Sequence, residues 1–196
     1  FKESLEVLKK DGAEIVDIEL PSAPLALAVY YIIMPAESST NLARFDGVRY
    51  GLSLQGDSLT DDYAKTRAAG FGPEVRRRIM LGTYVLSAGY YDAYYGKATA
   101  ARAVLRREYD DVLKNVDVIA TPTVPSPAFK VGEKSDPLSM YLADIFTVTA
   151  NLTGHPSLSI PIEGVRRNEK DLPVGIQFTA AEGGEEMLFA AGKMVK

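Results

Sequence analysis

The sequence predicts an α/β fold in which a mixed β-sheet of about four strands is flanked by helices. Several segments repeat their apolar residues at the three- and four-residue spacing of an amphipathic helix, the first of them around Leu5 and Leu8. Short apolar runs of the length of buried strands lie between these segments, at 15–20, 117–120, 157–162 and 174–178. The chain has no internal repeat or low-complexity tract, so residues 1–196 are predicted to form a single domain.

The N-terminal segments predict a helix, a strand and a second helix in that order. The opening helix is expected to end at Asp11-Gly12, and the strand at 15–20 follows. An apolar helix then begins at Ala23. We expect Pro35 to kink or break this helix, because proline lacks the N–H that an interior helix position donates.

The middle of the chain predicts three further helices. A short one within 57–71 has Ser58 or Thr60 as its candidate N-cap. A glycine and proline segment separates it from a helix that starts with three arginines at Arg76. A long, charged helix is expected at 90–114.

The last part of the chain predicts three strands and a closing helix. The apolar run at 117–120 leads into a proline-rich segment that favours an extended path. Two more strands follow, separated by a polar, basic segment, before a final helix. These elements are expected at 157–162, 163–171, 174–178 and 185–196.

Composition excludes several classes of function. The chain carries 22 basic and 26 acidic residues, a net charge of −4, which argues against a broad phosphate-binding surface. It has no cysteine and one histidine, so neither a thiolate metal site nor a histidine cluster is expected. The apolar stretch at 23–34 is shorter than the roughly 20 residues of a membrane-spanning helix, and no membrane association is expected.

The two ends of the sequence suggest a piece of a longer polypeptide. The chain opens directly into a helical pattern without a methionine, and it closes in another.

The block from Arg76 to Lys97 combines adjacent cations, small residues and five tyrosines, which is unusual for a core helix. No Gly-x-Ser-x-Gly elbow or other nucleophile and base constellation accompanies it. His155 lies in a Thr-Gly-His-Pro turn, where a structural role is favoured over that of a base. Gly183-Gly184 is too sparse for a phosphate cradle. The block is therefore interpreted as a recognition element, not a catalytic one.

Charged residues next to apolar ones are the best recognition candidates. Arg78 adjoins the apolar face that begins at Ile79, whereas Arg76 and Arg77 can point to solvent. Asp144 lies within an apolar run, where an inward carboxylate would need a partner. Such a pair could bind the carboxylate and ammonium of an amino acid. The alternative is that both are surface charges and that Tyr30 is a core residue.

An ordered series of motifs resembles one family. The series opens with Ala36-Glu37-Ser38-Ser39-Thr40-Asn41-Leu42-Ala43-Arg44-Phe45-Asp46-Gly47, continues through 77–95, 117–122 and 136–141, and ends with Leu172-Pro173-Val174-Gly175-Ile176-Gln177-Phe178. These segments are similar to the A subunits of glutamyl-tRNA(Gln) amidotransferases, which belong to the amidase-signature enzymes. The resemblance covers nearly the whole chain and implies part of an amidase-signature fold.

The resemblance implies a function for the parent protein. Such a protein hydrolyses glutamine and passes ammonia to the B and C subunits of a cytoplasmic heterotrimer, which amidates Glu-tRNA(Gln) for protein synthesis. The assembled complex uses ATP and Mg²⁺, and no cofactor is expected in this chain. The family's Ser-Ser-Lys machinery lies in an N-terminal half that has no counterpart here. No catalytic residue is therefore assigned, and the isolated chain is expected to be inactive.

The resemblance also places the family's glutamine-binding residues at Tyr30, Arg78 and Asp144. The planar guanidinium suits the α-carboxylate and the aspartate suits the α-ammonium, so a free amino acid is preferred over a plain amide. The sequence departs from the usual pattern at Thr149 and His155, close to Asp144. Two alternatives are a general amidase, which would lack this charge pair, and a noncatalytic module that binds partner proteins.

Overall fold

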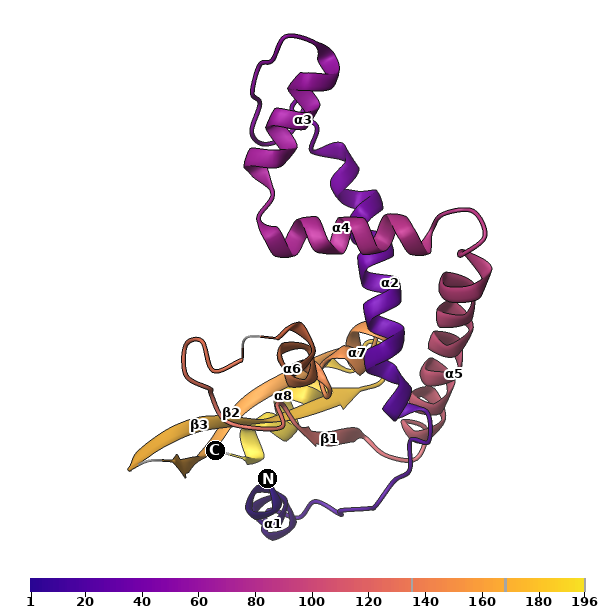
Figure 1. Cartoon of the computed structure of the whole chain (residues 1–196). Coiled ribbons are helices and arrows are strands. Elements are labelled where there is room, and N and C mark those ends of the chain that lie inside the picture. The colour runs from indigo at the N-terminus through magenta and orange to yellow at the C-terminus, as the bar shows by residue number, and fades with distance from the viewer. Residues whose placement is uncertain (135, 168, 196) are drawn as a thin grey trace. The chain divides into compact units, whose positions relative to one another are not determined.

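The structure is a computed structural model that describes residues 1–134, 136–167 and 169–195. The chain divides into two compact units, each described by itself below. The first unit comprises Phe1–Leu27 and Arg102–Lys196, and the second comprises Ala28–Ala101. The expectation of a single domain over 1–196 stays a prediction. Helices and strands are both present, which confirms the α/β class (Figure 1).

The sheet of the first unit contains three strands among the described residues. They are β1 (Val118–Pro122), β2 (Ser157–Arg167) and β3 (Lys170–Ala180), in the order β1-β3-β2. Both pairs are antiparallel, so this sheet is not of the mixed type that the sequence suggested. Strand β3 is central because Phe178 pairs with Ala120 on one side and Leu158 on the other.

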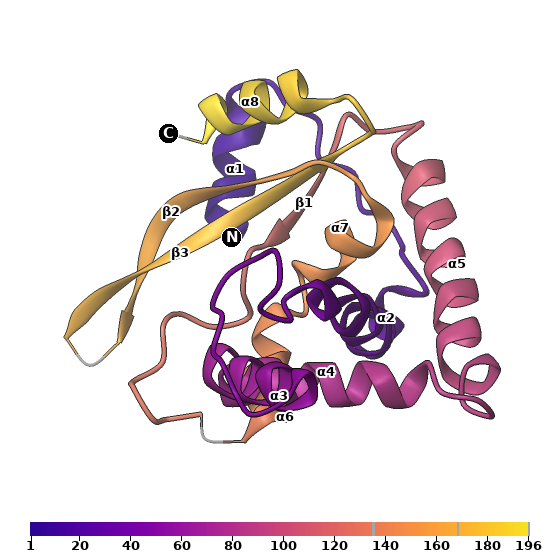
Figure 2. The ribbon, with the colours of Figure 1, turned by 90° about the horizontal axis from the view of Figure 1, so that it is seen from above.

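The main core lies between one face of this sheet and two helices, α1 (Lys2–Lys10) and α8 (Glu185–Met194). Figure 2 shows both helices on the same side of the sheet. Alternate residues of β3 point to one face of the sheet, and three of them, Ile176, Phe178 and Ala180, are at most 1% exposed within this core. Leu8 from α1 and Leu188 from α8 complete the packing from the helical side.

The expected strand at 15–20 does not join the sheet, which is why three strands are described instead of about four. This segment follows α1 without regular secondary structure. Ile15 packs on the main core, whereas Val16 is 55% exposed. The apolar residues at this position therefore reflect packing of a connecting segment onto the core, not a strand ladder.

Strands β2 and β3 are longer than the sequence suggested. The ladder runs through much of the polar segment at 163–171 and pairs Val165 with Leu172 and Arg167 with Lys170. A register shift between Ile162 and Val165 interrupts it. Asn168, which was also part of that segment, lies outside the described residues. Polar side chains fit here because most of these residues are exposed.

Most helices that lead to and from the sheet lie where the sequence predicted them. The helix expected at 90–114 contains a π-helical segment, Asp92–Gly96, followed by α5 (Lys97–Val112). Two short helices not anticipated from the sequence, α6 (Pro137–Tyr141) and α7 (Val148–Thr153), lie between β1 and β2. The closing helix was expected to reach Lys196, which is outside the described residues.

The second unit is built from helices. These are α2 (Ala26–Asn41), whose first two residues belong to the first unit, α3 (Leu59–Gly70) and α4 (Pro73–Val85). Ser58 caps α3 by accepting a hydrogen bond from the Asp61 N–H at 3.2 Å, which decides between the two predicted caps. No helix in the described parts of the chain is both long and apolar enough to cross a membrane.

Helix α2 continues through Pro35, so of the two expected outcomes the break is wrong and the kink stays a prediction. Proline removes the hydrogen bond that residue 35 would donate to the carbonyl of Tyr31. Pro35 is among the most deeply buried residues of the chain, and its neighbour Ala36 is 1% exposed. Packing around this position thus favours a continuous helix despite the lost bond.

Candidate functional site

Arg78 lies on α4 and is the most buried of the three consecutive arginines. Its side chain is 30% exposed, compared with 47% for Arg77, and Arg76 is exposed. The Nε atom donates to Glu74 Oε1 at 2.8 Å, one turn earlier on the same helix, and Nη1 lies 3.4 Å from Met34 Sδ on α2. Glu74 also pairs with Arg77. The guanidinium is therefore oriented from two helices of the second unit.

Tyr30 lies on α2, four residues before Met34, so the two side chains share a face of that helix. It is half-buried. Its ring meets that of Tyr31 edge to face, with centroids 5.2 Å apart. Tyr30 and Arg78 thus belong to the same unit. Met34 links them, because it lies one helical turn after Tyr30 on α2 and its sulfur contacts the Arg78 guanidinium.

Asp144 belongs to the first unit, where it is the last residue of a 3₁₀ turn, Leu142–Asp144, that follows α6. It is exposed, so it does not carry the desolvation cost expected of an inward carboxylate. Its carbonyl accepts hydrogen bonds from the N–H and the hydroxyl of Thr147, at 2.9 and 3.1 Å. These contacts fix the backbone on which the carboxylate is carried.

The segment that leads to Asp144 begins at a capped helix. Asp136 is the N-cap of α6 and accepts a hydrogen bond from the Ser139 N–H at 2.9 Å. Hydrogen bonds from the hydroxyl and amide of Ser139 hold the pKa of Asp136 below its usual value. The cap keeps this carboxylate charged and defines where the Asp144 segment starts.

Gln177 is a residue that sequence reasoning missed. It is 5% exposed on the face of β3 opposite the main core, and its Nε2 donates to the Phe146 carbonyl at 3.1 Å and to Thr121 Oγ1 at 3.4 Å. Phe146 is two residues from Asp144, so Gln177 ties the Asp144 segment to the sheet. The only sequence signal was an amide side chain inside an otherwise apolar strand.

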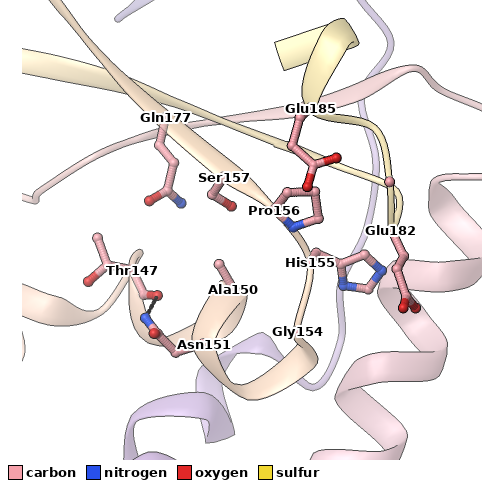
Figure 3. A pocket seen from close by; sticks show the side chains of 11 residues that line it. Thr147, Ala150, Asn151, Gly154, His155, Pro156, Ser157, Gln177, Glu182 and Glu185 are labelled. Carbon is pink, nitrogen blue, oxygen red and sulfur yellow. Dashed lines mark hydrogen bonds between the residues drawn. The ribbon is translucent and has the colours of Figure 1, made fainter. Parts of the chain in front are cut away.

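A cavity of about 580 Å³ adjoins this segment within the first unit. Figure 3 shows side chains from α7, the start of β2, β3 and the turn before α8 around it. In the cavity wall, the Asn151 side-chain amide donates a hydrogen bond to the Thr147 carbonyl at 2.9 Å. The hydroxyl of Ser157, another lining residue, is hydrogen-bonded to that of Thr179 at 2.7 Å. The lining is largely polar and includes two glutamates, Glu182 and Glu185.

His155 lines the same cavity and is held by a neighbouring helix. Its side chain is 3% exposed, and Nε2 lies 3.0 Å from Asp110 Oδ1 on α5. Its ring also packs on Tyr109, with centroids 5.8 Å apart. In the described residues no serine is hydrogen-bonded to this imidazole. This arrangement favours the structural role expected from the sequence.

Tyrosines at the end of α4 and in the segment after it form exposed ring clusters. Tyr84, Tyr90 and Tyr94 lie with ring centroids 4.4 to 6.2 Å apart, and each is more than 40% exposed. A hydrogen bond with Tyr90 and partial desolvation raise the pKa of Tyr84 to about 12. These rings pack on one another at the surface.

Comparison with known proteins decides the family. The Amidase family model matches residues 1–189. The chain belongs to the amidase family. The family assignment confirms the resemblance that the sequence motifs suggested.

Two curated relatives of this amidase-family chain carry the name of the A subunit of glutamyl-tRNA(Gln) amidotransferase. The one from Azorhizobium caulinodans is 54% identical over all of this chain and 40% of its own length. The one from Roseiflexus castenholzii is 54% identical over 96% of this chain and 38% of its own length. The chain thus spans about 40% of the length of these relatives.

Solved structures agree with the fold. The crystal structure of the A subunit of the Thermotoga maritima glutamyl-tRNA(Gln) amidotransferase is 40% identical, with a TM-score of 0.65, over 100% of this chain and 36% of that one. A bacterial aryl acylamidase of the amidase-signature family has the same TM-score at 17% identity and shows the fold alone. The amidase-signature fold expected from the sequence is therefore confirmed.

Proposed function

We propose that this chain is the glutamine-binding part of the A subunit of a glutamyl-tRNA(Gln) amidotransferase. The observation that carries the proposal is the 54% identity to curated A subunits over the full chain, combined with an oriented arginine at Arg78. Amidases with different substrates share the fold at 20% identity or less, so the fold alone would not select this activity.

Arg78 is proposed to bind the α-carboxylate of glutamine, and the resemblance to the family assigns the α-ammonium to Asp144. Arginine supplies a planar fork of donors that matches a carboxylate, and the Glu74 contact leaves its charge in place while fixing its direction. Asp144 is exposed, so an ammonium group that arrives from solvent can reach its carboxylate. Tyr30 contributes a half-buried wall with a polar tip.

The reaction itself is assigned to the remainder of the full-length protein, since this chain spans only about 40% of its relatives. In this proposal the present chain binds glutamine, and the rest of the full-length protein contributes the nucleophile and the base. Ammonia released there is passed to the B and C subunits of a cytoplasmic heterotrimer, which convert Glu-tRNA(Gln) to Gln-tRNA(Gln).

ATP and Mg²⁺ are assigned to the partner subunits of the complex. In the part of this chain that the structure describes, no three His, Asp or Glu side chains converge as a metal ion would require. No step of the proposal in this chain depends on either group.

The test compares glutamine with free ammonium as nitrogen donors. The sequence would be grafted into the A. caulinodans relative in place of its matching 40% and assembled with the partner subunits. We expect Arg78→Ala to raise the glutamine KM at least tenfold, and Asp144→Asn to raise it several-fold. Ammonium-driven amidation should stay within twofold, because ammonium bypasses the amino-acid site.

Two outcomes would contradict the proposal. Equal loss with both donors would mean that Arg78 supports the fold and does not read the substrate. An unchanged glutamine KM for Arg78→Ala would remove this residue from the site and favour a general amidase, whose substrates lack the α-carboxylate.

A further inference from the structure

Helices α2 and α4 of the second unit meet backbone to backbone at Gly82. Figure 1 shows α4 lying across α2. Gly82 is buried, and a Cβ built on it would lie 1.9 Å from the carbonyl oxygen of Pro35 and 2.7 Å from Ser39 Oγ. The nearest atom is backbone, so it cannot rotate away as a flexible side chain could. Only glycine fits at this crossing.

The crossing lies next to two of the candidate glutamine-binding residues, Arg78 and Tyr30. Arg78 is one helical turn before Gly82 on α4, and Met34 directly precedes Pro35 on α2. Arg78 Nη1 touches Met34 Sδ at 3.4 Å, and Met34 Sδ also accepts the Ser38 hydroxyl at 3.5 Å. Tyr30 is one turn before Met34. The register of the two helices therefore sets where Arg78 lies relative to Tyr30.

Residues around the contact add rigidity on the α2 side. Pro35 is almost fully buried, and Ala36 beside it is 1% exposed. The Ser39 hydroxyl, which borders Gly82, is held by the Ala36 carbonyl at 2.8 Å. A buried proline has a fixed φ, so this part of α2 cannot adjust cheaply to a larger residue on α4.

We infer that Gly82 is a positioning residue for the amino-acid site: it sets the approach of α4 to α2 that holds Arg78 against Met34 and in register with Tyr30. The inference rests on the proposed function of Arg78. A methyl group at residue 82 would have to move roughly 1.5 Å away from the Pro35 carbonyl to reach an ordinary van der Waals distance. Displacements of about 1 Å at a positioned group can lower activity about 100-fold.

The experiment uses Gly82→Ala in the full-length protein that carries this sequence, assembled with its partner subunits. We expect the glutamine KM to rise at least tenfold, while ammonium-driven amidation stays within twofold. The matched control is Gly70→Ala, at the end of α3 in the same unit, where a Cβ would meet nothing closer than 3.9 Å. Its glutamine KM should not change.

A second variant keeps the test decisive if Gly82→Ala does not fold. Met34→Leu conserves volume but removes the sulfur that touches the guanidinium. We expect it to raise the glutamine KM several-fold with an unaltered far-UV circular dichroism spectrum. An unchanged glutamine KM in Met34→Leu, or in a folded Gly82→Ala, would overturn the inference, as would equal loss with both nitrogen donors.

Arg78→Ala, measured in parallel, separates the two ideas. If Arg78→Ala raises the glutamine KM and Gly82→Ala does not, the positioning role is wrong and the proposed function stands. If Arg78→Ala leaves the glutamine KM unchanged, the proposed function of Arg78 fails first, and the positioning role fails with it.

Discussion

Replacing Gln177 by methionine should release the Asp144 segment from the sheet while leaving the main core intact. Gln177 is 5% exposed and lies on the face of β3 opposite Ile176 and Phe178. Methionine has a similar length and volume, so no large cavity forms. What is lost is the pair of donors on Nε2, one of which holds the carbonyl of Phe146.

The expected magnitude follows from the two hydrogen bonds. The 3.1 Å bond to the Phe146 carbonyl is a normal one, worth about 1 kcal/mol, and leaving a part-buried acceptor without it costs up to about 1 kcal/mol more. The 3.4 Å contact with Thr121 Oγ1 is near the outer limit of hydrogen bonding and contributes little. Gln177→Met should therefore destabilise this region by about 1–2 kcal/mol.

Hydrogen exchange of the amides in α7 is the sharpest assay, because this helix follows Phe146 directly. A loss of about 1.4 kcal/mol would speed exchange about tenfold if opening of this segment limits it. Thr121→Val is the matched control, since it removes only the long contact, and it should change exchange less than about twofold. Unaltered α7 exchange in Gln177→Met, or an equal effect in Thr121→Val, would refute the reasoning.

Two further predictions concern packing and titration. Phe178→Ala should lower the free energy of unfolding by about 3–5 kcal/mol in urea denaturation, because Phe178 is fully buried, whereas Phe189→Ala, at 60% exposure, should change it by less than about 0.5 kcal/mol. Equal effects would contradict the described core. For Tyr84, whose pKa is raised from 10.0 to about 12, any stabilisation from the neutral phenol is fully present below pH 10 and is lost as pH rises towards about 12. In a pH titration followed by tyrosinate absorbance, Tyr84→Phe should lack the tyrosine that ionises near pH 12. Tyr90→Phe should lower the pKa of Tyr84 back towards 10, because Tyr90 is the main cause of the shift. A tyrosine that still ionises near pH 12 in Tyr84→Phe would contradict the assignment.

Local patterns were sufficient to predict the elements whose signals are local. The opening and closing helices, an N-cap at Ser58 or Thr60, of which the structure has Ser58, and the apolar parts of strands β1, β2 and β3 follow from periodicity and capping chemistry. The segment at 15–20 was wrongly predicted to be a strand, because an apolar residue that packs on the core, such as Ile15, gives the same sequence pattern as a strand residue. Whether such a segment joins a sheet depends on a free neighbouring edge, which the sequence of the segment does not encode.

Pro35 shows a second limit of local rules. Its propensity argued for a kink or a break in α2, yet the helix is not broken, because tertiary packing around a deeply buried residue outweighs one lost helix hydrogen bond. The hairpin of β2 and β3 shows the same effect in reverse, because backbone pairing extends through a polar segment that periodicity treated as a connection. At Pro35 contacts distant in sequence determined the outcome, whereas in the hairpin it was backbone pairing between residues close in sequence, such as Arg167 and Lys170, which side-chain periodicity does not show.

The candidate site was predictable to the extent that its chemistry is visible in residue types. Arg78 was preferred over Arg76 and Arg77 from its apolar neighbours, and it is the most buried of the three. Its role, and those of Tyr30 and Asp144, stay predictions until glutamine and ammonium are compared. The contacts with Met34 and between Gln177 and Phe146 could not be predicted, since they join residues 44 and 31 positions apart.

This difference has a physical origin. The chemistry of a charged side chain can be inferred from its residue type, but the position of its charge cannot, because the long, flexible stem allows many positions. Glu74 restricts the direction of the Arg78 guanidinium from the same helix, yet it cannot set the distance from α4 to α2. That distance is set where the backbones touch, at Gly82 and Pro35, by residues that carry no reactive group. The residues proposed to bind the substrate and those that place them are thus of different chemical kinds, and only the first are apparent before the fold is known.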